Sequence, residues 1–268
     1  MTFQPVLPLS GFAGWSFLQR TYDAQREAFT QSPAIDRLTD HFRETISTIF
    51  TAEALVEDRR LMQVALGAFG LDDDINAKAF IREILSEGTQ ADDALANRLA
   101  DKRYRQLSEA FGFGDFGPRT VLPSFATEII NRYEARQFEI AVGEQDADMR
   151  VALSLGDSLT DLFDQASGED AQWFAMMGNP PLRRTFEVAL GLPAAFGQVD
   201  IDDQLITFKD RAASVLGVES FSEFADPDMQ EDLIRMFLVR AQVEAGNSLT
   251  NGTIALTLLQ SVAPLNPA

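Results

Sequence analysis

The sequence offers few side chains that could carry out catalysis or hold a metal. His41 is its single histidine and it has no cysteine, so a thiolate nucleophile, a Cys-ligated zinc and a histidine-rich metal site are excluded. A Ser-His-Asp triad would depend on His41 alone, which lies in the run Asp40-His41-Phe42-Arg43 within a helical pattern. We interpret His41 as an ordinary helical side chain and predict no catalytic residue.

An acidic run could be read as a calcium loop. Asp72, Asp74 and Asn76 have the spacing of its first three ligands, and Glu83 stands at the twelfth place. The sixth place needs glycine for a sharp turn, and here it is Ala77, from which a helical pattern begins. We therefore interpret the aspartates as acids that open a helix, where they oppose its dipole, and predict no metal.

The glycines of the segment Gly112-Phe-Gly-Asp-Phe-Gly117 are spaced almost as in a dinucleotide-binding loop. That motif needs a preceding strand and a helix whose N-terminus faces the pyrophosphate, and neither is predicted here. We interpret the segment as a helix stop and predict no cofactor. With 41 acids some carboxylates always lie close together, so paired carboxylates remain an open possibility.

The charge of the chain restricts its partners. It carries 22 Lys and Arg against 41 Asp and Glu, a net charge of -19 with a pI near 4.3. Residues 1–123 have 13 basic and 18 acidic side chains, and residues 124–268 have 9 and 23. This field repels phosphate backbones and anionic lipid, so we predict no nucleic-acid binding and expect any electrostatic partner of the second half to be basic.

Hydropathy gives no sign of a membrane or secretory segment. No stretch approaches 18 consecutive apolar residues, and the first residues lack the basic and apolar regions of a cleaved signal. We expect a soluble chain without membrane insertion, located in the cytoplasm or on a flagellum as argued below.

Apolar residues recur at helical spacing and the breaks carry helix stops, so the predicted fold class is all-α, a multi-helix bundle. The alternating β-branched runs of a sheet are missing. The predicted helices in the first half cover about 13–30, 33–49, 51–69, 72–88, 92–100 and 102–111. Those in the second half begin with a long helix from Ser124 and continue near 146–165, 169–177, 181–190, 200–216 and 227–245.

An internal echo indicates two diverged helical repeats. Residues 59–67, RRLMQVALG, recur as residues 183–191, RRTFEVALG, identical at six of nine positions. The predicted organisation is an uncharged N-terminal segment (1–12), helical repeat 1 (13–116), a Gly/Pro linker (117–123), helical repeat 2 (124–246) and an uncharged C-terminal segment (247–268).

Both ends of the chain lack charge. Residues 1–19 and 245–268 contain no charged side chain, although 24% of the whole chain is charged. These ends could dock on the core, or they could be contact segments for a partner or an assembly. Our interaction candidates are Leu7, Leu9, Phe12 and Trp15 at the first end and Leu249, Ile254, Leu258 and Leu259 at the second.

Four stretches carry a resemblance to a known family: residues 5–20 (PVLPLSGFAGWSFLQR), 64–75 (VALGAFGLDDDI), 94–104 (ALANRLADKRY) and 110–115 (AFGFGD). They resemble a bacterial domain-of-unknown-function family whose members are often encoded among flagellar genes. The resemblance covers about residues 5–116. It implies a role in flagellar assembly or motility, and the family has no established catalytic residues to transfer.

Three functions follow as hypotheses. The first is a non-enzymatic, flagellum-associated structural or assembly protein that acts through protein-protein contacts, with flagellar components as partners. The second is a cytosolic chaperone or regulator of flagellar export, whose acidic surface would suit basic clients. The third is a small-ligand-binding or enzymatic helical domain. The oligomeric state, the partner and any export are left open.

Overall fold

The structure is a computed structural model that describes residues 3–261, with side chains described as far as Gly246 except at Ala194. Every regular element in this range is a helix, which confirms the all-α, multi-helix class. The first helices are α1 (Gly11–Thr30), α2 (Pro33–Thr45), α3 (Ala52–Glu57), α4 (Arg59–Ala68), α5 (Lys78–Glu87), α6 (Leu95–Arg98) and α7 (Arg103–Phe111). The others are α8 (Phe125–Gly143), α9 (Ala147–Gln165), α10 (Glu169–Gly178), α11 (Pro180–Leu190), α12 (Ile201–Leu216) and α13 (Pro227–Ser261).

Five 3-10 helices join these elements: η1 (Ile46–Thr48), η2 (Asp72–Asn76), η3 (Arg119–Val121), η4 (Ala194–Gln198) and η5 (Phe221–Ala225). The chain divides into two compact units. Unit 1 consists of Met1–Val6 and Thr21–Val142, and unit 2 of Leu7–Arg20 and Gly143–Ala268. Helix α1 therefore contributes its first ten residues to unit 2 and its remaining residues to unit 1.

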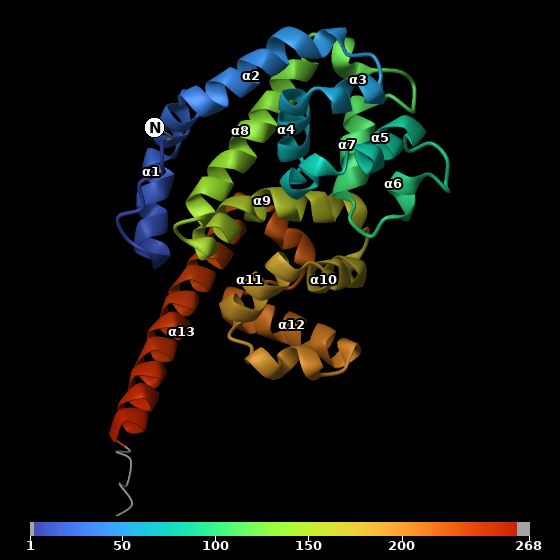
Figure 1. Cartoon of the computed structure of the whole chain (residues 1–268). Coiled ribbons are helices and arrows are strands. Elements are labelled where there is room, and N and C mark those ends of the chain that lie inside the picture. The colour runs from blue at the N-terminus through green and yellow to red at the C-terminus, as the bar shows by residue number, and fades with distance from the viewer. Residues whose placement is uncertain (1–2, 262–268) are drawn as a thin grey trace, which may run out of the picture. The chain divides into compact units, whose positions relative to one another are not determined.

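The core of unit 1 is closed by aromatic and aliphatic side chains of α2, α4, α7 and α8. Phe42, Phe111, Tyr133 and Phe138 are all fully buried. Helix α2 packs on α4, α3 packs on α5, and α4 runs beside α8 (Figure 1). The approach of α4 to α8 is close enough that a Cβ atom at Gly67 would stand 2.8 Å from the Tyr133 ring.

The segment 117–123, which the sequence suggests as a linker, lies inside unit 1. Thr120 is buried, and its hydroxyl donates a hydrogen bond of 2.6 Å to the carbonyl of Ile49. The segment also forms η3, which packs on η1. Its prolines and glycines therefore turn the chain toward α8 within a packed surface, and the compact units separate instead next to Gly143.

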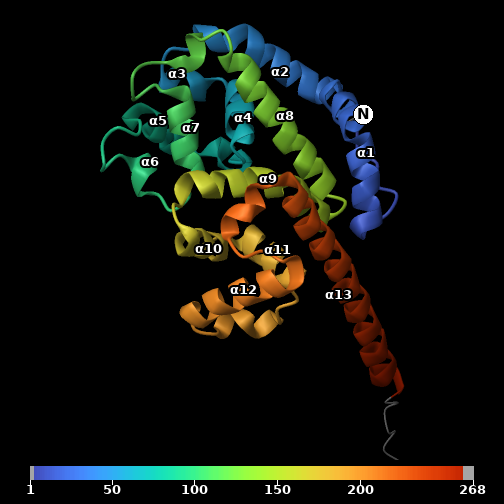
Figure 2. The ribbon, with the colours of Figure 1, turned by 180° about the vertical axis from the view of Figure 1, so that it is seen from behind.

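Unit 2 is built around a cluster of aromatic rings. Trp173 of α10 meets Phe221 edge-on, with ring centroids 4.9 Å apart, and Phe186 meets Phe224 in the same way at 4.9 Å. Such edge-to-face pairs add to the hydrophobic burial of the rings. Helix α11 packs along α13, and α9 also contacts α13 (Figure 2).

A single carboxylate ties this aromatic cluster together. Glu169, in the first turn of α10, accepts hydrogen bonds from the Trp173 indole (2.7 Å), the Ser220 hydroxyl (2.7 Å) and the Phe221 amide (3.0 Å). Burial alone would raise the pKa of Glu169, but these bonds, led by the Ser220 hydroxyl, outweigh it and hold the pKa below its ordinary value. Glu169 thus stays ionised and anchors η5 to α10.

Two predicted helices are divided where the sequence suggested none. The helix expected over 51–69 breaks at Asp58, whose carboxylate caps α4 by accepting from the amides of Arg60 (2.9 Å) and Leu61 (3.2 Å). The helix expected over 72–88 is the 3-10 turn η2 followed by α5, which begins at Lys78. A side chain that caps from within an apolar periodicity leaves that periodicity almost unchanged, so the period alone does not reveal the break.

The two copies of the internal echo occupy related but shifted positions. Residues 59–67 lie on α4 and residues 183–191 on α11, and each helix is followed by a 3-10 helix and then a longer helix. Gly191 ends α11 with φ +67°, whereas its counterpart Gly67 lies inside α4, which ends at Gly70 with φ +68°. The shared element order is compatible with a duplication, which stays a hypothesis.

A substitution tests the close approach of α4 to α8. We expect Gly67→Ala to destabilise the protein by about 1–3 kcal/mol, because the methyl group meets the Tyr133 ring and forces a shift. Gly178→Ala, at the end of α10 with nothing within 4 Å, is the matched control and should be neutral or stabilising by up to about 1 kcal/mol. Urea unfolding followed by circular dichroism measures both. Equal effects of the two substitutions would contradict the packing described.

Candidate interaction surface

The N-terminal candidates differ in how far they are buried. Leu9 has 57% of its surface exposed, and Leu7 and Phe12 are half-buried. Trp15 is only 5% exposed, so it belongs to the core of unit 2. The first three therefore offer apolar surface, and Trp15 holds the segment in place.

Three contacts fix this segment beside α13. The Trp15 indole donates to Glu231 at 3.0 Å, and the Gln19 amide donates to the same carboxylate at 2.9 Å. At Gly11 a Cβ atom would stand 2.5 Å from the Gln242 amide oxygen. The start of α1 consequently runs antiparallel to α13, with residue 19 beside 231 and residue 11 beside 242.

The packed part of α13 ends abruptly. Leu233, Phe237 and Ala241 face the interior of unit 2 and are buried. The next five residues, 242–246, are all exposed, whereas the helical backbone continues to Ser261. Leu249, Ile254, Leu258 and Leu259 lie outside the described side chains.

Two apolar residues lie on the opposite side of α13. Val239 and Val243, one helical turn apart, are 46% and 57% exposed. We define the terminal surface as Leu7, Leu9 and Phe12 together with Val239 and Val243, all in unit 2. Sequence reasoning missed the two valines, although their spacing of four residues and their position off the Leu233, Phe237 and Ala241 face could have indicated them.

The single histidine serves a structural contact in unit 1. His41 Nε2 lies 2.7 Å from Asp58 Oδ2, while the other oxygen of Asp58 caps α4. Burial would raise the pKa of Asp58, but the hydrogen bond to His41 and those from the Leu61 and Arg60 amides lower it below the ordinary value of 3.8. The nearest hydroxyl, that of Thr45, is 3.5 Å from His41 Nδ1, too long for an activated nucleophile.

A depression of about 440 Å³ lies beside this pair. Its lining is Ala54, Glu57, Asp58, Arg59 and Arg60, a mixture of both charges. Two of these groups already have partners in the fold, since Asp58 caps α4 and Arg59 donates to the Asn76 side chain at 3.2 Å. The depression therefore lacks the convergent polar groups on an apolar wall that characterise small-molecule sites.

The acidic run that resembles a calcium loop forms η2 and binds its neighbours. Asp72 accepts from the Gln137 amide at 2.8 Å, and Asp74 accepts from the Tyr104 hydroxyl at 2.7 Å. Burial and this hydrogen bond raise the pKa of Tyr104 to about 12. Because α5 begins after η2, the aspartates do not open that helix as the sequence suggested. Among the described residues no group of three or more acids, histidines or cysteines could hold a metal ion.

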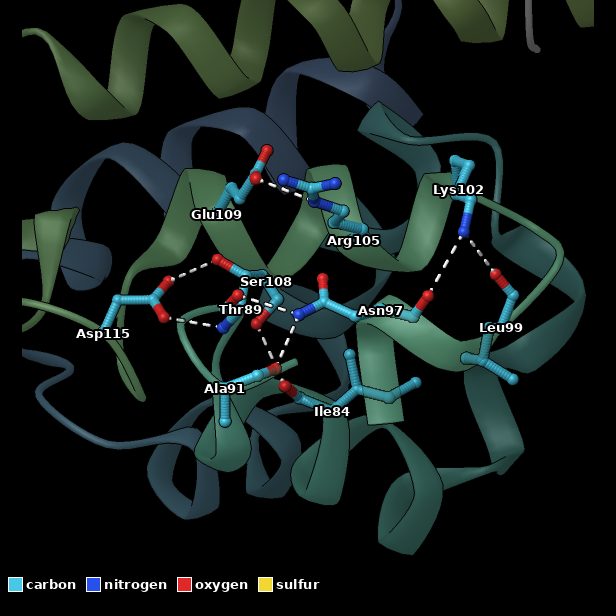
Figure 3. A network of polar contacts seen from close by, with 10 residues as sticks. All are labelled: Ile84, Thr89, Ala91, Asn97, Leu99, Lys102, Arg105, Ser108, Glu109 and Asp115. Atoms are coloured by element: carbon cyan, nitrogen blue, oxygen red, sulfur yellow. Dashed lines mark hydrogen bonds and ion pairs between the residues drawn. The ribbon is translucent and has the colours of Figure 1, made fainter. Parts of the chain in front are cut away.

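The glycine-rich segment packs against the end of α5 (Figure 3). Asp115 accepts from the Thr89 amide at 2.6 Å and from its hydroxyl at 3.2 Å, and the Asn97 amide donates to the Thr89 and Ala91 carbonyls at 2.8 Å each. A Cβ atom at Gly114 would collide with the backbone of Gly88. Glycine is needed here for backbone contact within the protein, and Gly112 ends α7 at φ +68°.

Hydropathy agrees with the charge: in residues 3–261 no helix is long and apolar enough to cross a membrane. The fold and the surface thus define an all-α protein with an exposed apolar surface next to a charge-free helix.

Comparison with known proteins gives a family and a fold. The family model "Protein of unknown function (DUF1217)" matches residues 68–229, more than half of the chain, and the chain belongs to this family. The resemblance to a family of unknown function is thereby confirmed, and the match reaches into the second half. The terminal surface lies outside the matched residues.

A search of curated proteins finds no match. The chain is similar to the X-ray crystal structure of protein AGR_C_984 from Agrobacterium tumefaciens, with a TM-score of 0.69 and 22% sequence identity. The alignment covers 90% of this chain and 99% of that one. At this identity the similarity shows the fold alone.

The Asp58 contacts give a pH-dependent test. We expect Asp58→Ala to cost about 1–2 kcal/mol at pH 7, because α4 loses its cap and His41 its partner. The pKa of Asp58 is lowered in the folded state, so its stabilisation is fully present above pH 3.8 and is lost as the pH falls through the folded-state pKa. Urea unfolding at pH 7, 5, 4 and 3 should show the gap to the native protein closing only at the acid end. Asp92→Ala, at an exposed acid, is the control, and a gap independent of pH would refute this role.

Proposed function

We propose that the protein is a non-enzymatic, flagellum-associated structural or assembly protein that acts through protein-protein contacts at the terminal surface. The observation that carries the proposal is the end of burial at Ala241, after which α13 continues for twenty residues. Exposed apolar surface of this kind on an otherwise acidic protein is typical of an interaction site.

The sequence supports the same location. Residues 245–268 contain no charged side chain, and Leu9, Val239 and Val243 extend the apolar character onto the packed part of unit 2. The interaction candidates Leu7, Leu9 and Phe12 lie beside α13, and Leu249, Ile254, Leu258 and Leu259 follow along the chain. The flagellar assignment rests on the resemblance of residues 5–116 to a family often encoded among flagellar genes.

A second candidate function rests on charge. Unit 2 contains 20 acidic and 8 basic side chains, a net charge of -12. Such a surface would attract a basic client and favours a cytosolic chaperone or regulator of flagellar export. The two functions differ in salt dependence, because an apolar contact survives salt that screens a contact between charges.

The test compares two surface variants in motile cells. We expect the native protein to co-purify with isolated flagella or their basal bodies and its deletion to reduce spreading in soft agar. Val239→Glu with Val243→Glu should abolish co-purification, while unfolding free energy changes by less than about 1 kcal/mol because both sites are exposed.

Ile206→Glu is the matched control, an equally exposed residue on α12 of the same unit, and should behave like the native protein. A protein found only in a soluble complex that 0.5 M salt dissociates would support the chaperone instead. Absence from both fractions, with normal motility of the deletion strain, would refute a flagellar role.

A further inference from the structure

We propose that the terminal surface and the helix that continues from it bind a second copy of this chain, forming a two-fold homodimer. This inference rests on the proposed function and names the first partner of that surface. It follows from three properties of α13: where its packing ends, how weakly its sequence favours a helix, and how its charge is distributed.

The first property is length. Ala241 is the last buried residue of α13, and from Gln242 to Ser261 the helix extends for about 30 Å at 1.5 Å per residue. Val239 and Val243 carry exposed apolar surface back onto the packed half. The surface available to a partner is therefore elongated and follows one helix.

The second property is low intrinsic helix propensity. Residues 247–261, NSLTNGTIALTLLQS, contain three threonines, two asparagines and a glycine, all poor helix formers. A helix of this length and composition is marginal in water and depends on packing of its apolar side chains. At 100° per residue Leu249, Ile254 and Leu259 fall on different sides of the helix axis, a pattern typical of a helix enclosed by neighbours.

The third property decides between partners. Each chain carries a net charge of -19, so two copies repel one another through most of their surfaces. Glu244 is the last charged residue, and beyond it two copies can approach without like charges in contact. A basic partner would gain nothing from a surface without carboxylates, whereas a second copy brings an identical uncharged surface.

A contact of this kind is isologous, because the same residues serve both copies around a two-fold axis. Antiparallel α13 helices satisfy this symmetry, with the Val239 and Val243 turn of one copy near the far half of α13 in the other. The contact is apolar and opposed by long-range repulsion, so salt should strengthen it. An attraction between opposite charges would have the opposite dependence.

Sedimentation equilibrium of the full chain between 5 and 200 µM tests the proposal. We expect a concentration-dependent change from 29.6 kDa to twice that mass, with the midpoint at least threefold lower in 0.5 M than in 0.05 M sodium chloride. Val239→Glu with Val243→Glu, and separately Leu256→Glu, should each weaken association at least tenfold. Ile206→Glu should leave it unchanged, and circular dichroism should show all variants folded.

A monomer at 200 µM in 0.5 M salt would overturn the dimer, as would association that weakens with salt or that Ile206→Glu abolishes equally. These results leave the proposed function separately testable. A monomeric native protein that still needs Val239 and Val243 to co-purify with flagella would refute only the dimer. A dimer found in cells whose flagella lack the protein would refute only the flagellar role.

Discussion

The burial of one face of α13 is the contact on which the terminal surface depends. Leu233, Phe237 and Ala241 fix the first half of the helix against α11 and α9, and Glu231 on the same half accepts from Trp15 and Gln19. The helix is thus held at one end only, and its direction past Gln242 is set by packing that lies entirely before that residue. An apolar, charge-free segment is presented to partners because a short, well-packed segment precedes it.

Much of this arrangement could be predicted from the sequence. The spacing of apolar residues predicted the helical class and the positions of most helices, and Thr51 caps α3 as its position suggested, accepting from the Ala54 amide at 3.2 Å. What could not be predicted depended on partners distant along the chain. Trp15 has the composition of an exposed contact residue until Glu231, 216 residues away, is placed beside it. Val239 and Val243 look like core residues until the buried face of α13 is known.

The candidate chemistry failed for a common reason. His41, Asp74 and Asp115 each belong to a pattern associated with catalysis or ligand binding, and each is used to hold one element of unit 1 to another. In a chain with 41 acids and one histidine, polar side chains within the fold are needed for caps and turns, because buried amides and hydroxyls must find acceptors. The untested duplication has a similar difficulty, since Gly67 and Gly191 match in sequence while one lies within a helix and the other ends one.

The partnership of Trp15 with Glu231 has a consequence for biosynthesis. A ribosome that adds about 5–20 residues per second needs roughly 10–40 s to make the 216 residues between them. During that time the indole and the neighbouring Leu18 have emerged without the helix that completes their environment. Unit 2 therefore cannot finish folding until almost the whole chain has been translated, and its earliest residues are among the last to reach their native surroundings.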